Sequence, residues 1–133
     1  VVEAGVLKGY FLSTYSARKL GMRTTGNAGG SHNLIVRPGK RDLVGLAALM
    51  GRGLLVTEVL GQGVNYVTGD YSRGASGYWV ENGEIRHPVQ EITIAGNLKD
   101  MLRDIVAVGS DVLVRGSKQV GSILLERMTI AGA

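Results

Sequence analysis

Residues 61–83 constrain the fold of this chain more than any other stretch, because six glycines alternate there with residues that favour strands. The β-branched and aromatic side chains between the glycines favour extended backbone. Glycine permits conformations that other residues avoid, and it lets a second backbone come close. The pattern therefore predicts strands that bend, bulge or lie very near another part of the chain.

Composition excludes several kinds of protein and site. The chain has 133 residues, enough to bury the core of one domain, and charged residues or glycines interrupt every apolar run before it could cross a bilayer. The absence of cysteine excludes disulfides and thiolate metal sites, and it is typical of a reducing cytoplasm. His32 and His87 lie far apart in the sequence, so neither a metal site nor a histidine-based triad is indicated. The chain begins without an initiator methionine or a basic leader, so we expect a piece of a longer protein.

Charge is spread unevenly along the chain. Residues 1–53 carry eight basic and two acidic side chains, whereas residues 54–133 carry seven basic and nine acidic ones. A basic first half could attract phosphate or an acidic protein surface. The cations are scattered and form no compact basic run, so we expect no direct contact with nucleic acid. A basic nucleic-acid-binding module, with Arg18, Lys19 and Arg23 among its cations, remains an alternative.

Apolar and β-branched runs predict short strands along most of the chain. We expect them at residues 5–12, 33–37, 54–60, 64–68, 78–81, 84–86, 89–94, 111–115 and 122–131. Residues 54–60 are almost continuously apolar, which indicates a strand buried on both faces. Residues 69–77 are expected to be a polar connection, and Asn82 and Gly83 predict a type I′ hairpin turn.

Three helices are expected from capping residues and apolar periodicity. The first starts at Ser13 or Thr14 and ends near Leu20, the second runs from Asp42 to Met50, and the third starts at Asn97 and ends near Val106. A polar, glycine-containing loop at residues 24–32 lacks the ending of a phosphate-binding loop. The predicted fold class is α+β, with a mixed, largely antiparallel, barrel-like β-sheet and about three short helices.

Polar residues and glycines in residues 61–73 are the candidate contacts for an extended peptide or a partner protein. They are Gly61, Gln62, Gly63, Asn65, Tyr66, Asp70, Tyr71, Ser72 and Arg73. A purely structural role is equally compatible with the sequence, because Asp70 and Ser72 are common turn residues and Arg73 can pair with an acidic neighbour. Tyr66 is also of the type that packs in a core or an interface.

Several segments resemble the C-terminal domain of the TldD/PmbA family of zinc metallopeptidases and modulators of DNA gyrase, in its PmbA (TldE) branch. The motif GQGVNYVTGDYSRGASG at residues 61–77 is one of them. The others are residues 15–22, 24–30, 79–83 and 91–98. The resemblance covers nearly the whole chain and implies that residues 1–133 are a single C-terminal domain of a parent protein whose N-terminal part is absent here.

The resemblance also implies where the metal of such a complex lies. In the family, the TldD-like subunit carries zinc on two histidines of a His-Glu-x-x-x-His helix and on a cysteine near its C-terminus. The position that matches this cysteine is Val120, within residues 116–122, and a valine side chain cannot bind zinc. We therefore expect no catalytic residue, metal ligand or cofactor in these residues, and zinc in a TldD-type partner.

The function implied by the resemblance is that of an auxiliary subunit, without metal, of a TldD-like zinc peptidase complex that processes or degrades unfolded peptides. For the family this activity is described as modulation of DNA gyrase. The expected partners are a TldD-like subunit or a second copy, as a dimer, and an extended peptide substrate, in the cytoplasm. The other alternative is that the chain is part of a metallopeptidase that is active on its own.

Overall fold

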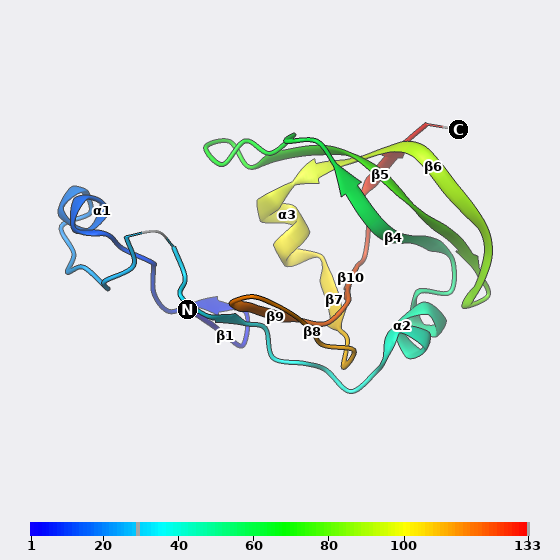
Figure 1. The fold of residues 1–133 in the computed structure, drawn as a ribbon, viewed down its shortest axis with the longest axis horizontal. Coiled ribbons are helices and arrows are strands. Elements are labelled where there is room, and N and C mark those ends of the chain that lie inside the picture. Colours follow the sequence, from blue (N-terminus) through cyan, green and yellow to red (C-terminus); the bar gives the residue numbers. More distant parts are fainter. Residues whose placement is uncertain (29, 133) are drawn as a thin grey trace. The chain divides into compact units, whose positions relative to one another are not determined.

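The computed structural model describes residues 1–28 and 30–132 of the chain, which fall into two compact units (Figure 1). Unit 1 contains Val1–Ile35 and Val114–Gln119, and unit 2 contains Val36–Leu113 and the chain from Val120 onward. Among the described residues, strands predominate, nearly all pairs are antiparallel and there are three helices. The α+β class is therefore confirmed, and the sheets are open rather than closed into a barrel.

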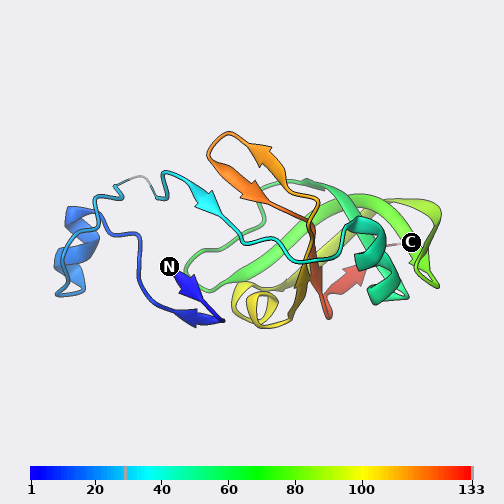
Figure 2. The ribbon, with the colours of Figure 1, turned by 90° about the horizontal axis from the view of Figure 1, so that it is seen from below.

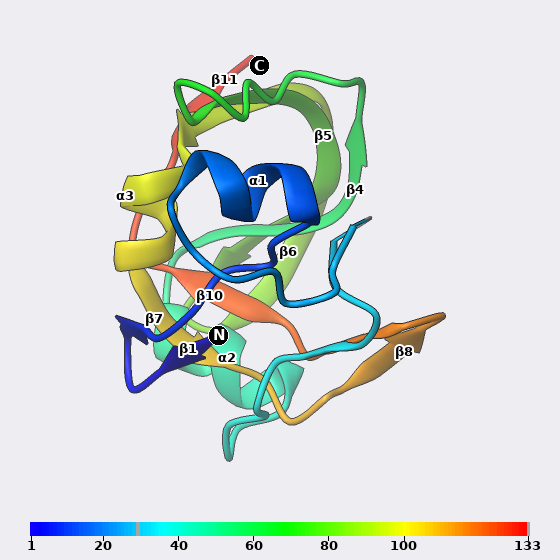
Figure 3. The same cartoon turned by 90° about the vertical axis from the view of Figure 1, so that its left-hand side faces the viewer.

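Helix α1 of unit 1 spans Thr14–Lys19 (Figure 3), and the residues at its start stabilise it. Ser13 is the N-cap: its Oγ accepts a hydrogen bond from Ser16 N at 3.2 Å, and its own N–H donates to Ser16 Oγ at 2.9 Å. This reciprocal pair is a capping box, which satisfies amide groups that have no partner within the helix. The helix expected from Ser13 or Thr14 is thus confirmed, and it ends one residue before Leu20.

The strands of unit 1 are short. β1 (Val2–Glu3) pairs with β2 (Val6–Leu7) in antiparallel fashion, and β3 (Leu34–Ile35) pairs in parallel with β9 (Lys118–Val120). β9 also pairs with β8 (Leu113–Arg115), and Figure 2 shows these two strands as an orange hairpin.

The strand expected at residues 5–12 is therefore wrong beyond β2. Leu12 N donates to Thr25 Oγ1 at 2.8 Å, and Leu12 O accepts from Thr24 Oγ1 at 2.9 Å. These side-chain hydroxyls satisfy backbone groups that a sheet partner would otherwise satisfy.

A curved antiparallel sheet dominates unit 2 (Figure 1). Its strands, in spatial order, are β11 (Thr129–Ala131), β6 (Glu84–Asn97), β5 (Asp70–Glu81) and β4 (Gly53–Leu60). β5 and β6 are joined by Asn82 and Gly83, whose φ angles of 53° and 76° are both positive. This conformation and the pairing of Glu81 with Glu84 confirm the predicted type I′ turn.

Two expectations around the start of β5 are wrong. Residues 69–77 are not a connection, because β5 begins at Asp70 and its glycines lie against β4; a Cβ at Gly77 would collide with the Leu55 carbonyl. Residues 64–68 are not a strand, because only Val64 forms a bridge, to Tyr71. The glycines here permit close strand approach rather than a turn.

β4 is not buried on both faces, contrary to expectation. Gly53–Val56 are half-buried and the second half of the strand is exposed. β4 is the last strand in the sheet order, so one of its edges has no strand partner within the part of the chain that the structure describes. The core of the sheet lies on the two central strands, at Ala75 of β5 and at Ile92 and Ile94 of β6.

The remaining elements of unit 2 lie on the concave side of this sheet (Figure 1). They are α2 (Leu43–Met50), α3 (Leu98–Arg103), β7 (Ile105–Val108) and β10 (Ile123–Leu125), and β7 pairs with β10. Asp42 caps α2 and Asn97 caps α3, as expected. α3 ends before its predicted end at Val106 because the chain enters β7, and the strand expected at residues 122–131 is divided into β10 and β11.

Candidate peptide and partner contact site

The segment that follows β4 folds back onto the first residues of β5. Ser72 N donates to Gly63 O at 2.7 Å, and Asn65 N donates to Asp70 O at 2.8 Å. Gly63 lies so close to β5 that a Cβ at this position would collide with the Ser72 carbonyl. The approach of the two backbones therefore requires glycine at position 63.

Asn65 and Asp70, two of the candidate contacts, hold this loop together. Asn65 Oδ1 accepts hydrogen bonds from Val67 N at 2.9 Å and Thr68 N at 3.2 Å. Asp70 Oδ2 accepts from Thr68 Oγ1 at 2.6 Å, and Asp70 Oδ1 accepts from Asn97 Nδ2 at 3.4 Å. The Asn65 oxygen is thus used within the loop, as in an Asx turn, and the Asp70 carboxylate links the loop to the end of β6.

The side chains of Arg73 and Tyr71, both in β5, contact other parts of the sheet. Arg73 Nε donates to Leu60 O at 3.4 Å and its Nη2 donates to Val59 O at 3.5 Å, so the guanidinium lies against the last carbonyls of β4. The sequence suggested that Arg73 could pair with an acidic neighbour, but in the described part of the chain it forms no ion pair with a carboxylate. Tyr71 is half-buried against the core of the sheet.

The side chains left open to solvent are concentrated at the tip of the loop. Tyr66 is 86% exposed, and Val67, which the sequence did not single out, is 96% exposed. Gln62 and Ser72 are exposed as well. The structure thus brings the candidate residues together in this loop and the first residues of β5. Gln62, Tyr66 and Ser72 are accessible, Asn65 and Asp70 are exposed but use their side-chain oxygens in hydrogen bonds, and Tyr71 is half-buried.

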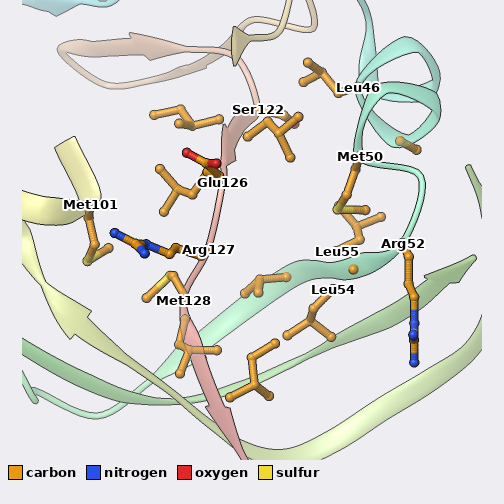
Figure 4. A pocket seen from close by; sticks show the side chains of 18 of the residues that line it. Leu46, Met50, Arg52, Leu54, Leu55, Met101, Ser122, Glu126, Arg127 and Met128 are labelled. Atoms are coloured by element: carbon orange, nitrogen blue, oxygen red, sulfur yellow. The ribbon is translucent and has the colours of Figure 1, made fainter. Parts of the chain in front are cut away.

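An apolar pocket of about 610 Å³, which the sequence did not predict, lies between α2, α3, the sheet and the chain that runs from β10 to β11 (Figure 4). It is lined by Met50, Met101, Met128, Leu54, Tyr71 and Arg52, among others. No local pattern could reveal it, because its walls come from segments far apart in the sequence. Of the candidate contacts, Tyr71 alone lines it among the described residues.

A second polar cluster lies just after Val120. Ser122 Oγ donates to Asp111 Oδ2 at 2.6 Å, and Ser122 N donates to Asp111 Oδ1 at 3.2 Å. The hydroxyl bond, helped by the backbone bond, lowers the pKa of the Asp111 carboxyl, although partial burial opposes this shift. Gly109 and Gly121 leave no space for a side chain beside this pair.

The residues present do not fit a zinc site. In residues 1–28 and 30–132, no group of three or more His, Cys, Asp or Glu side chains is placed to hold a metal ion. His32 and His87 are both exposed, and Val120 is half-buried.

No helix of the described chain has the length and apolar character to span a membrane.

The cations proposed for nucleic-acid contact are all exposed in unit 1. Arg18 and Lys19 lie in the last turn of α1, and Arg23 follows the helix. The Lys19 ammonium lies 5.5 Å from the centre of the Tyr15 ring, an ordinary cation–π distance. Unit 1 buries two hydrophobic side chains among its described residues, Leu12 and Ala17.

Comparisons with known proteins place these features in a family. Residues 1–132 match the family model described as the PmbA/TldA metallopeptidase C-terminal domain. The chain is 59% identical over 133 residues to a metalloprotease PmbA homologue from Haemophilus influenzae, covering 99% of this chain and 30% of the relative. It is 55% identical over 132 residues to metalloprotease PmbA of Escherichia coli O157:H7, covering 99% of this chain and 29% of that protein.

A TldD homologue from Buchnera aphidicola (subspecies Schizaphis graminum) is more distant, with 26% identity over 157 residues that cover 99% of this chain and 32% of the relative. The chain therefore spans about 30% of the length of the curated relatives that it matches.

Two solved structures share the fold. A candidate modulator of a DNA gyrase from Thermotoga maritima is 45% identical with a TM-score of 0.88, over 98% of this chain and 32% of that one. TldE from Thermococcus kodakarensis is 27% identical with a TM-score of 0.83, over 98% of this chain and 33% of that one. The resemblance stated from the sequence is confirmed by these matches.

Proposed function

Because the chain belongs to the PmbA/TldA metallopeptidase C-terminal domain family, we propose that it serves as the C-terminal domain of a PmbA-type auxiliary subunit, without metal, of a TldD-like zinc peptidase complex. The observation that carries this proposal is the contrast between 59% identity to a PmbA homologue and 26% to a TldD homologue. Residues 1–133 form a single C-terminal domain in this proposal, and the complex works on unfolded peptides in the cytoplasm.

The zinc belongs to the TldD-type partner in this proposal. Two features support that assignment: the described residues offer no cluster of metal-ligating side chains, and Val120 stands where the resemblance implies a cysteine in the TldD branch. No chemical step is assigned to a residue of this chain. Its contribution is to bind and position the peptide and to complete the complex.

The open edge of β4 and the loop that follows it form the proposed peptide contact. An extended peptide can add to a sheet edge through main-chain hydrogen bonds, which do not depend on its sequence. The exposed side chains of Gln62 and Tyr66 lie in the segment that directly continues β4, and that of Ser72 lies at the start of β5, against which this segment folds. Recognition through backbone groups suits a substrate that is unfolded and variable in sequence.

Unit 1 supplies the proposed contact with the TldD-like subunit or with a second copy. Large apolar side chains are exposed over most of it, which is typical of interaction surfaces rather than of free solvent-facing surfaces. They are Val1, Val2, Val6, Leu7, Tyr10, Phe11, Tyr15, Leu20, Met22, Leu34, Ile35 and Val114.

Reconstitution of the complex tests the proposal. The full-length protein that contains this chain is mixed with a TldD-type subunit, and hydrolysis of an unstructured peptide is followed. We expect the mixture to be active and the full-length protein alone to be inactive. Activity of the full-length protein without the partner would favour an independently active metallopeptidase and would overturn the proposal.

The same assay tests the peptide contact at the loop. Replacing Tyr66 by alanine is expected to raise KM about five-fold with little change in kcat, because a side chain that binds substrate and transition state equally affects KM. Ile85→Ala is a suitable control, since Ile85 is 55% exposed and lies at the other end of the β5–β6 hairpin. Equal kinetic constants for Tyr66→Ala and the unchanged protein would exclude the loop tip as a peptide contact.

A further inference from the structure

We propose that the pocket lined by Met50, Met101 and Met128, called the methionine pocket below, binds an apolar side chain of an unfolded peptide segment that carries an adjacent acidic residue. Arg52 at its margin would bind the carboxylate. The inference rests on the proposed function and deepens it by naming a chemical class of substrate. It assigns a binding role to residues outside the loop that follows β4.

Methionine is concentrated in this pocket. Three of the four methionines in the sequence line it, and they come from α2, from α3 and from the segment between β10 and β11. Methionine side chains are unbranched and polarisable, so a surface made of them adapts to apolar groups of different shape. Such a surface suits a peptide that is apolar but has no fixed sequence.

Glycines of the sheet give these methionines their positions. A Cβ at Gly53 would lie 2.7 Å from Met50 Sδ. A Cβ at Gly96 would lie 3.6 Å from Met101 Sδ and 3.8 Å from Met128 Cε. The side chains of Met50, Met101 and Met128 therefore pack directly over glycine backbone, and a side chain at position 53 would displace Met50.

The pocket is large enough for part of a peptide. Its volume of about 610 Å³ is within the range of sites that enclose small ligands, roughly 300–1,000 Å³. Leu54, Val56 and Ile94 add apolar wall on the side of the sheet. The pocket can therefore hold more than one apolar side chain.

The charges at the margin favour a carboxylate near Arg52. The Arg52 guanidinium lies 5.5 Å from the centre of the Trp79 ring, and in the described part of the chain it forms no ion pair. Arg127, in contrast, is paired with Asp104 at 3.1 Å, and the hydrogen bond to Asp104 raises the pKa of its guanidinium. Figure 4 shows Arg52 on the side of the pocket away from Glu126. The acidic residue on the side of Arg52 is Glu81, and its carboxylate accepts a hydrogen bond from the Trp79 indole at 3.0 Å.

The pocket extends along the first half of β4. Gly53, Leu54, Leu55 and Val56 all line it, although successive side chains of a strand point to opposite faces. The pocket therefore contacts backbone atoms of β4 as well as side chains. Arg52 directly precedes these residues, so a peptide that places an apolar side chain in the methionine pocket can place an adjacent acidic one at Arg52.

Binding of a synthetic peptide to the full-length protein tests this inference. The probe is a fluorescein-labelled serine–glycine peptide that contains two adjacent leucines followed by glutamate, and binding is followed by fluorescence anisotropy without the partner subunit. Met101→Gln is expected to weaken binding about ten-fold, because it places an amide in an apolar pocket. Met50→Gln, from a different element, repeats the test if Met101→Gln does not fold.

Arg52 is tested by changing both partners. Arg52→Gln is expected to weaken binding of the glutamate probe about five-fold and to leave a probe with glutamine in place of glutamate unchanged. Arg86→Gln is the matched control, because Arg86 is an exposed arginine of β6 outside the pocket lining. Equal losses for both probes would overturn the role of Arg52.

Absence of saturable binding, or equal binding when serines replace the leucines, would overturn the methionine pocket as a peptide site. The first result is also the one expected if another part of the longer protein fills the pocket. The assay uses no partner subunit and measures no hydrolysis. Failure of peptide binding here is therefore separate from failure of the reconstituted peptidase, which concerns the proposed function.

Discussion

At the scale of single residues, Gly63 has the most demanding position in the loop that follows β4. Alanine at this position would place its Cβ against the Ser72 carbonyl, which is backbone of β5 and cannot move aside cheaply. We expect Gly63→Ala to lower the free energy of unfolding by about 2–3 kcal/mol. Urea denaturation measures this change.

Gly74→Ala is the control for this substitution. A Cβ at Gly74 would lie 3.5 Å from Leu60 Cβ, an ordinary van der Waals contact. The expected change in the free energy of unfolding is therefore within about 1 kcal/mol. Similar losses for the two variants would show that the close approach at Gly63 does not stabilise the loop.

Asp111 and Ser122 predict a dependence of stability on pH. Folding lowers the pKa of Asp111, so its contribution to stability is present above the pKa of the unfolded chain, about 4, and is lost as the pH falls through the folded value. We expect Ser122→Ala to be less stable by about 1–2 kcal/mol at neutral pH, because the carboxylate loses its hydroxyl donor. The difference from the unchanged protein should shrink below pH ~4.

Urea unfolding at neutral and at acid pH measures this difference. Ser110→Ala serves as the control, since Ser110 is an exposed serine one position before Asp111. A stability difference for Ser122→Ala that stays the same at both pH values would mean that the hydrogen bond does not act through the charge of Asp111.

At the scale of elements, the turn between β5 and β6 sets the register of the longest hairpin. Gly83 has a φ of 76°, and a Cβ there would lie 2.9 Å from Ala48 Cα in α2. Gly83→Ala is therefore expected to cost about 2 kcal/mol of stability, through backbone strain and through the contact with α2.

Asn82→Gly is the matched variant at the other position of the turn. Asn82 has a φ of 53°, which glycine adopts without strain. Its melting temperature should stay close to that of the unchanged protein, whereas that of Gly83→Ala should fall clearly. Equal melting temperatures for Asn82→Gly, Gly83→Ala and the unsubstituted protein would show that position 83 does not require glycine.

Helix starts and this turn could be predicted from sequence because their chemistry is local. Ser13, Asp42 and Asn97 each cap a helix through a bond to an amide two or three residues later. Such bonds depend on neighbours in the sequence alone. The ends of α3 and of the short strands are less local, since they depend on where a partner strand begins.

The first half of β5 and the exposure of β4 could not be predicted, because both depend on which strands become neighbours in the sheet. The glycines of residues 61–83 are expected to let another backbone come close, and Gly77 does so, but its partner, β4, could not be identified from the sequence. The apolar run of β4 looks like a central strand, but the order of the sheet places it at the edge. The methionine pocket likewise depends on contacts between distant segments.

At the scale of the whole molecule, the basic residues of unit 1 allow a test of the alternative that the chain is a nucleic-acid-binding module. Arg18, Lys19 and Arg23 are exposed, so they could bind phosphate if this surface were used for it. We expect the full-length protein to show no salt-dependent affinity for duplex DNA in a gel-shift titration at low salt. Affinity that falls when these three residues are changed to glutamine would favour the alternative.

The central claim is that this subunit needs a metal-bearing partner. Metal analysis of the purified full-length protein, before and after it is combined with a TldD-type subunit, tests it most directly. The account predicts no stoichiometric zinc in the protein alone and stoichiometric zinc in the combined, peptidase-active complex. Stoichiometric zinc and peptide hydrolysis in the protein alone would contradict it.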